Sequence, residues 1–155
     1  MSKVSAYALF RILFFVLLAE GAAGHAIAWL GWVAVLAMLA GSILALAQTD
    51  VRRMLAYSSV SQMGYIFFGF SLGSPIALVG ALFHVLNHAV VKGCLFLVAG
   101  GVRWRTGTSS VAGFVGMGRR LPLSMLAFAV AAVSLVGLPP TAGFFSKWYL
   151  LLGAF

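Results

Sequence analysis

The sequence predicts an all-α membrane protein: a polytopic transmembrane helix bundle of about five spans, the last of them discontinuous. Of its 155 residues, 63% are hydrophobic and only 8% are charged, whereas soluble domains carry about 25% charged residues. The apolar residues form long runs with short polar segments between them. Glycine is abundant, as is usual for membrane helices. We expect residues 1–155 to form a single transmembrane domain.

Five apolar runs define the expected helices. In chain order they cover about residues 4–20, 27–47, 52–72, 76–101 and 121–153. Asp50 is expected to cap the third helix, because an aspartate side chain accepts hydrogen bonds from the first amides of a helix. Pro75 is expected in the first turn of the fourth helix, where it is well tolerated. The apolar runs continue from end to end, so we expect no removable signal peptide.

The fifth run is too long for one straight span. As a continuous helix it would extend roughly 50 Å, whereas the hydrocarbon core of a bilayer is about 30 Å thick. Adjacent prolines flanked by glycines predict a break within it. The break residues are Gly137, Pro139, Pro140 and Gly143. Irregular backbone at membrane depth survives only where it is buried in protein or lines a wet cavity, so the break marks a candidate site.

A ladder of ionisable side chains interrupts the fourth run. His84, His88 and Lys92 recur every four residues, which places them on one helical stripe with the first and last roughly 12 Å apart along the axis. Ionisable groups at membrane depth are costly, so the ladder is a candidate functional site. Two histidines at this spacing could bind a metal. The adjacent lysine and the lack of carboxylate partners favour a proton pathway and no metal site.

Lys147 lies one turn beyond the expected break. A lysine near a helix end can extend to the membrane surface, which is one interpretation. The other is a lysine that gains and loses protons at the break. Trp148, Tyr149 and further apolar residues follow Lys147, which argues against the first interpretation. Polar residues in the third and fourth runs serve packing or support the pathway. The supporting residues we expect are Tyr57, Ser58, Ser61 and Asn87.

The arginines predict an orientation. All but Arg11 fall in the second and fourth connections, which must share one side of the membrane if each helix spans once, and the positive-inside rule makes that side cytoplasmic. The two groups are Arg52 and Arg53, and the Arg103 to Arg120 segment. The net charge of +8 does not indicate nucleic acid, since the basic residues lie at helix ends or singly within spans. We expect a bacterial or archaeal inner-membrane protein.

Three long motifs resemble the antiporter-like membrane subunits of NADH:quinone oxidoreductase (respiratory complex I), which are similar to Mrp-type cation/proton antiporters and to membrane-bound hydrogenases. The motifs run from Asp50 to Tyr65, from His84 to Leu97 and from Gly137 to Lys147. The resemblance implies an all-helical membrane protein. It also implies that the chain is a fragment, reaching from the last helix of one inverted repeat through the broken helix of the next, and so a partial proton-conducting module.

The same resemblance implies roles for five residues. His84, His88 and Lys92 would line a central hydrophilic axis, Lys147 would be the terminal lysine of the second half-channel, and Lys3 would connect the two half-channels. The leading hypothesis is therefore a proton-translocating subunit of an NADH:quinone oxidoreductase-type complex. We expect it to have no catalytic site and no cofactor of its own, because redox energy would come from partner subunits.

Two other functions stay open from the sequence. One is a D-type component of a multisubunit Na⁺/H⁺ antiporter, which would use the same residues and carry Na⁺ as well as protons. The other is a structural membrane subunit in which the ladder only packs. In all three cases the expected partners are other membrane subunits and the lipid bilayer.

Overall fold

The computed structural model describes residues 2–12 and 23–155, and the described residues are largely helical with no strand. The all-α prediction is therefore confirmed. The elements in chain order are α1 (Ser2–Arg11), α2 (Ala23–Leu46), α3 (Val51–Ser71), α4 (Pro75–Thr106), the short 3₁₀ helix η2 (Val111–Phe114), α5 (Met117–Arg120), α6 (Pro122–Val136) and α7 (Ala142–Leu152).

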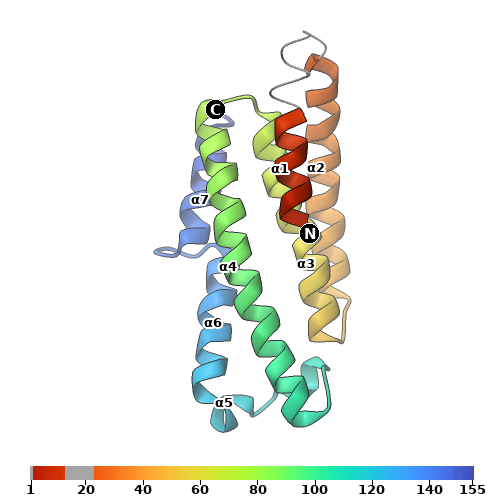
Figure 1. The fold of residues 1–155 in the computed structure, drawn as a ribbon, viewed down its shortest axis with the longest axis vertical. Helices are drawn as coiled ribbons and strands as arrows, with labels where there is room; N and C mark the ends of the chain where they lie inside the picture. The colour runs from red at the N-terminus through yellow and green to blue at the C-terminus, as the bar shows by residue number, and fades with distance from the viewer. Residues whose placement is uncertain (1, 13–22) are drawn as a thin grey trace.

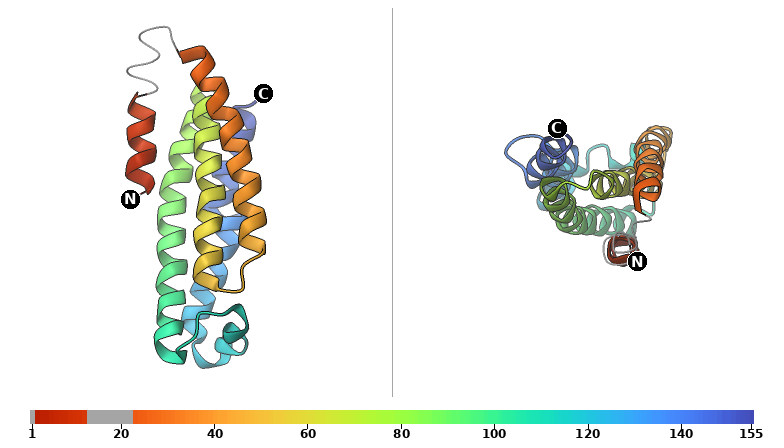
Figure 2. Two further views of the ribbon diagram at one scale, coloured as in Figure 1. Left: turned by 90° about the vertical axis from the view of Figure 1, so that its right-hand side faces the viewer. Right: turned by 90° about the horizontal axis from the view of Figure 1, so that it is seen from above.

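The long helices form an elongated bundle. Helices α2, α3 and α4 run side by side along its length, and α6 and α7 follow one another along α4 (Figure 1). Helix α1 lies on the outside of this bundle, where it packs against α3 (Figure 2). The stacked pair α6–α7 therefore covers the length of α4, as expected of one discontinuous span.

In the part of the chain that the structure describes, two helices, α2 and α4, are long and apolar enough to cross a membrane by length and composition. Helix α3 runs alongside them (Figure 1), and its polar middle makes it less apolar. The expected first span is described only as far as residue 12, so the remainder of that prediction lies outside the described residues.

The predicted starts of α3 and α4 are confirmed. The Asp50 carboxylate accepts hydrogen bonds from the backbone amides of Arg52 at 2.8 Å and Arg53 at 3.2 Å, and so caps α3. Pro75 is the first residue of α4. Aspartate satisfies amides that have no partner within the helix, and proline has no amide hydrogen to lose.

The end predicted for the fourth helix, near residue 101, is wrong. Helix α4 continues to Thr106, so Arg103 and Arg105 lie in its last turn and not in a polar connection. Cationic side chains are favourable at a helix C-terminus because of the helix dipole. Gly107 ends the helix in the left-handed conformation, with φ of 73°, and its amide donates to the Arg103 carbonyl oxygen.

Two apolar clusters hold the bundle together. The first joins α3, α4 and α6, and includes Leu55, Leu95 and Ala131. The second joins α3, α4 and α7, and includes Phe70 and Leu150. Along α4 the ladder lies where the two clusters meet: Ala81 of the second cluster precedes it, Leu95 and Ala99 of the first follow it, and Val91 of the first falls within it. We call the buried ladder and its polar partners the polar layer.

Candidate functional site

The ladder residues lie on one buried face of α4, as their spacing predicted. His84, His88 and Lys92 are 1%, 2% and 3% exposed. The two imidazole rings stack with their centroids 6.3 Å apart and their planes at 9°. The Lys92 ammonium donates to the Leu55 carbonyl oxygen at 2.6 Å and to the Ser58 hydroxyl at 2.5 Å, both from α3. The lysine end of the ladder is therefore fixed at the interface between α3 and α4.

His84 joins three helices. Its Nε2 atom lies 2.9 Å from Gln62 Oε1 of α3, and its Nδ1 atom lies 2.9 Å from the Ser146 hydroxyl oxygen of α7. The Ser146 hydroxyl is also placed to donate to the Gly143 carbonyl oxygen at 3.0 Å. A hydroxyl group can both donate and accept, so by rotating it can serve either protonation state of Nδ1. This arrangement suits a group that exchanges a proton without moving its backbone.

The helix break occurs where the sequence predicted it. Helix α6 ends at Val136 and α7 begins at Ala142. Gly137 caps α6 with φ of 87°, a conformation that L side chains rarely adopt. At Gly143 an added Cβ would clash with the Ser134 carbonyl oxygen. The two helix ends therefore approach too closely for a side chain at this position.

Lys147 extends from α7 back to the end of α6. Its ammonium donates to the carbonyl oxygens of Leu135 at 3.1 Å and Val136 at 2.9 Å. These oxygens belong to the last turn of α6, where the helix dipole favours a cation. The ammonium also lies 5.0 Å from the centroid of the Tyr65 ring, within the range of a cation–π interaction. In the structure Lys147 thus spans the break.

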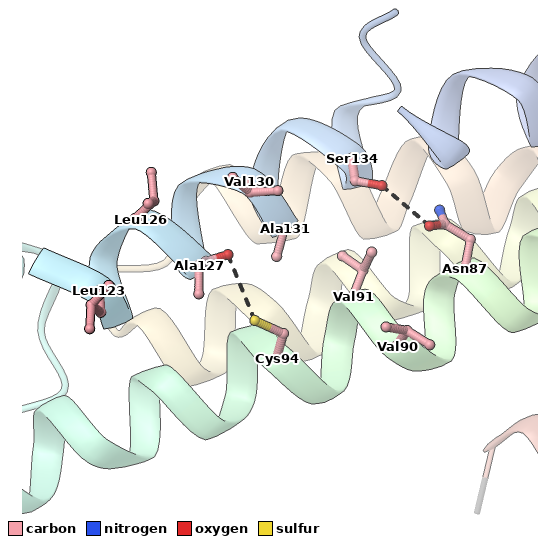
Figure 3. A pocket seen from close by; sticks show the side chains of 10 residues that line it. All are labelled: Asn87, Val90, Val91, Cys94, Leu123, Leu126, Ala127, Val130, Ala131 and Ser134. Atoms are coloured by element: carbon pink, nitrogen blue, oxygen red, sulfur yellow. Dashed lines mark hydrogen bonds between the residues drawn. The ribbon is translucent and has the colours of Figure 1, made fainter. Parts of the chain in front are cut away.

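Asn87 ties α4 to the end of α6. The Ser134 hydroxyl donates to Asn87 Oδ1 at 3.2 Å. Both residues line one end of a groove of about 530 Å³ between α4 and α6, whose other walls are mainly aliphatic (Figure 3). Cys94 also lines this groove, with its thiol 3.7 Å from the Ala127 carbonyl oxygen. This placement gives Cys94 the role of a small packing residue.

Comparison with known proteins identifies the family. Residues 1–155, the whole chain, match the family model described as NADH:quinone oxidoreductase/Mrp antiporter, transmembrane. The chain belongs to this family. The resemblance inferred from the three motifs is thereby confirmed, and the fold agrees with it.

Individual relatives come from both branches of this antiporter family. NADH-quinone oxidoreductase subunit N of Desulforudis audaxviator is 59% identical over 153 residues, covering 99% of this chain and 30% of that protein. The D-type subunit of the Na(+)/H(+) antiporter of Alkalihalophilus pseudofirmus is 36% identical over 155 residues, covering 100% and 31%. Among solved structures, a chain of the archaeal membrane-bound sulfane sulfur reductase superposes with a TM-score of 0.87 at 33% identity, covering 96% of this chain and 30% of that one. The chain thus spans about a third of the length of these relatives.

Not every residue expected at the site contacts the ladder. Ser61 lies 2.9 Å from Ser42 of α2, so its hydroxyl contributes to the α2–α3 interface. Tyr57 is exposed on α3. Lys3 falls within α1, but its side chain lies outside the described residues. In the part of the chain that is described, no three His, Cys, Asp or Glu side chains gather in one place as a metal site would require.

The structure adds site residues that the sequence reasoning missed. They are Gln62, Tyr65, Ser134 and Ser146. Ser58, Gln62 and Tyr65 are spaced four and three apart, which places them on one face of α3. This spacing is a signal that could have been used, because the antiparallel partner α4 carries the ladder. Ser146 had no comparable signal, since its contact with α4 depends on how α7 is placed after the break.

Proposed function

We propose that the chain forms the central part of a proton-translocating membrane subunit of the NADH:quinone oxidoreductase type. The observation that carries this proposal is the buried polar layer where the two apolar clusters meet, which holds His84, His88 and Lys92 and contacts Ser146 of α7, the helix that carries Lys147. Ionisable groups are retained at such depth when they serve transport. In this proposal residues 1–155 are a single transmembrane domain, a partial module of a larger conducting unit.

The proton moves along the layer between Lys92 and Lys147. From Lys92 the route passes His88 and His84, whose Nδ1 exchanges with the Ser146 hydroxyl on α7. Water supplies the steps that side-chain hydrogen bonds leave open. Two positive charges in a low-dielectric layer repel one another, so the protonation of one group disfavours the protonation of its neighbour and keeps the proton moving. Lys3 connects this route to the other half-channel.

Energy for transport comes from partner subunits in this proposal, since the chain is expected to hold no cofactor. Other membrane subunits of the complex are its partners. The arginine-bearing ends of α3 and α4 and the α5 segment lie at one end of the bundle (Figure 1). This grouping supports the cytoplasmic assignment of the Arg52/Arg53 and Arg103–Arg120 segments in the inner membrane of a bacterium or archaeon.

The second candidate is a subunit of an Na⁺/H⁺ antiporter. It is supported by the match to the D-type antiporter subunit along the whole chain. The higher identity to subunit N, 59% against 36%, favours the redox-driven alternative. A purely structural role would leave unexplained why three ionisable side chains occupy the polar layer at considerable desolvation cost.

Proton uptake by proteoliposomes containing the assembled complex tests these alternatives. Uptake that starts with electron donor and quinone and needs no Na⁺ supports the proposal, and uptake that requires a Na⁺ gradient supports the antiporter. His88→Ala and Lys147→Ala should each abolish uptake while the complex still assembles. Ser42→Ala is the control, because Ser42 lies outside the polar layer. Full uptake in both test variants would refute the proton route.

A further inference from the structure

A cavity at the arginine-rich end of the bundle has the features of a binding site for an anionic head group. It has a volume of about 440 Å³ and lies between the start of α3 and the end of α4. Arg52 and Arg53 line it from α3, and Arg103 lines it from α4. All three side chains are exposed. The guanidinium groups come from two helices that converge on one cavity, which is a suitable arrangement for binding phosphate.

The cavity stays electropositive although it contains a carboxylate. Asp50 also lines it and is the one acidic side chain among the described residues. The lining therefore carries three positive charges and one negative charge. That carboxylate accepts a hydrogen bond from the Ser109 hydroxyl and two more from the amides that begin α3. The Ser109 hydroxyl and the α3 amides lower the pKa of the Asp50 carboxyl, so the count of charges is constant near neutral pH.

The apolar wall of the cavity distinguishes a lipid from a soluble anion. Ala56 and Phe96 form this wall, and both also line a second cavity of about 430 Å³ farther along α3 and α4. The apolar surface therefore continues from the arginines towards the membrane interior, the direction that an acyl chain takes from its phosphate. The deeper part of the second cavity presents His88 and Lys92 and belongs to the polar layer already described.

We propose that this cavity binds the phosphate of one anionic phospholipid, held by Arg52, Arg53 and Arg103, with an acyl chain against Ala56 and Phe96. Basic pockets between membrane helices on the cytoplasmic side suit such head groups. None of the three arginines belongs to the proton route.

Lipid titration of the purified, delipidated membrane complex tests the site. Native mass spectrometry would measure binding of phosphatidylglycerol and, for comparison, zwitterionic phosphatidylcholine. Arg52→Gln combined with Arg103→Gln should weaken phosphatidylglycerol binding about 25-fold, from two charges that each contribute about fivefold. Arg119→Gln combined with Arg120→Gln is the matched control. It removes the same charge from the same end of the bundle, but these residues do not line the cavity, so it should change affinity less than threefold.

Two further measurements distinguish a seated lipid from nonspecific charge attraction and from a site for free phosphate. Ala56→Trp fills the apolar wall without changing charge, and it should weaken phosphatidylglycerol binding as well. Inorganic phosphate added as a competitor should displace little lipid. If the two arginine-pair variants lost the same phosphatidylglycerol affinity, general charge attraction would explain the binding and the proposal would be overturned. Equal binding of the two lipids by the unaltered complex, or full displacement of the lipid by inorganic phosphate, would also overturn it.

Discussion

The strongest test of the polar layer is the substitution Ser146→Ala. Ser146 is 0% exposed, and its hydroxyl is the contact between His84 Nδ1 and α7. Alanine removes this hydroxyl and leaves a buried ring nitrogen without its partner, which costs about 1–3 kcal/mol. If the cost falls on the proton-transfer barrier, proton uptake slows by roughly 5- to 160-fold.

The assay is the initial rate of proton uptake by proteoliposomes that contain the assembled complex, normalised to the amount of complex. Ser42→Ala is the matched control, because it removes a serine hydroxyl from the α2–α3 interface, where Ser42 contacts Ser61. We expect the control to retain at least half of the uptake rate. If Ser146→Ala kept the full rate in a normally assembled complex, the route from His84 to α7 would be wrong.

Three other substitutions test separate parts of the structure. Gly143→Ala forces a Cβ against the Ser134 carbonyl oxygen and should destabilise the subunit by about 3 kcal/mol, the upper end of the range for overpacking. Native gels should show a loss of assembled complex, and normal assembly would contradict the close approach of α6 and α7. Lys92→Met removes the hydrogen bonds to α3 and should abolish proton uptake without preventing assembly, and uptake above a tenth of the original rate would exclude Lys92 from the route. Asp50→Asn should lower the melting temperature at pH 7, because the folded state lowers the pKa of Asp50 and the ionised carboxylate stabilises it. This difference should disappear as the pH falls through the folded-state pKa of the carboxyl; an equal difference at low pH would contradict the role of its charge.

Much of the fold follows from local features of the sequence. The break between α6 and α7 could be predicted because adjacent prolines and a left-handed glycine act on the backbone where they stand. The cap at Asp50 is local in the same sense. The end of α4 lies beyond its predicted position, because arginines that follow an apolar run favour the prediction of a loop. A helix that extends beyond the hydrocarbon core can carry arginines in its last turn, and only Gly107 stops it.

The contacts of the site could be predicted only in part. The ladder spacing places His84, His88 and Lys92 on one face of α4, but it does not tell which helix that face meets. The partners of His84 come from α3 and α7, and they depend on the rotation of each helix and on the angle of the break. These are properties of packing between distant segments, which periodicity within one helix does not determine.

Helix α7 links the last two groups of the proposed proton route, His84 and Lys147. Ser146 and Lys147 are adjacent in sequence and therefore point in different directions: Ser146 meets His84 on α4, whereas Lys147 meets the last carbonyl oxygens of α6. Those carbonyl oxygens attract the charged ammonium of Lys147 more strongly than its neutral amine. Loss of the Lys147 proton would therefore weaken the contact between α7 and α6. A small movement of α7 would then change the distance between Ser146 and His84. In the proposed route, the break would allow the charge on Lys147 to influence proton transfer at His84, which a single continuous helix would resist.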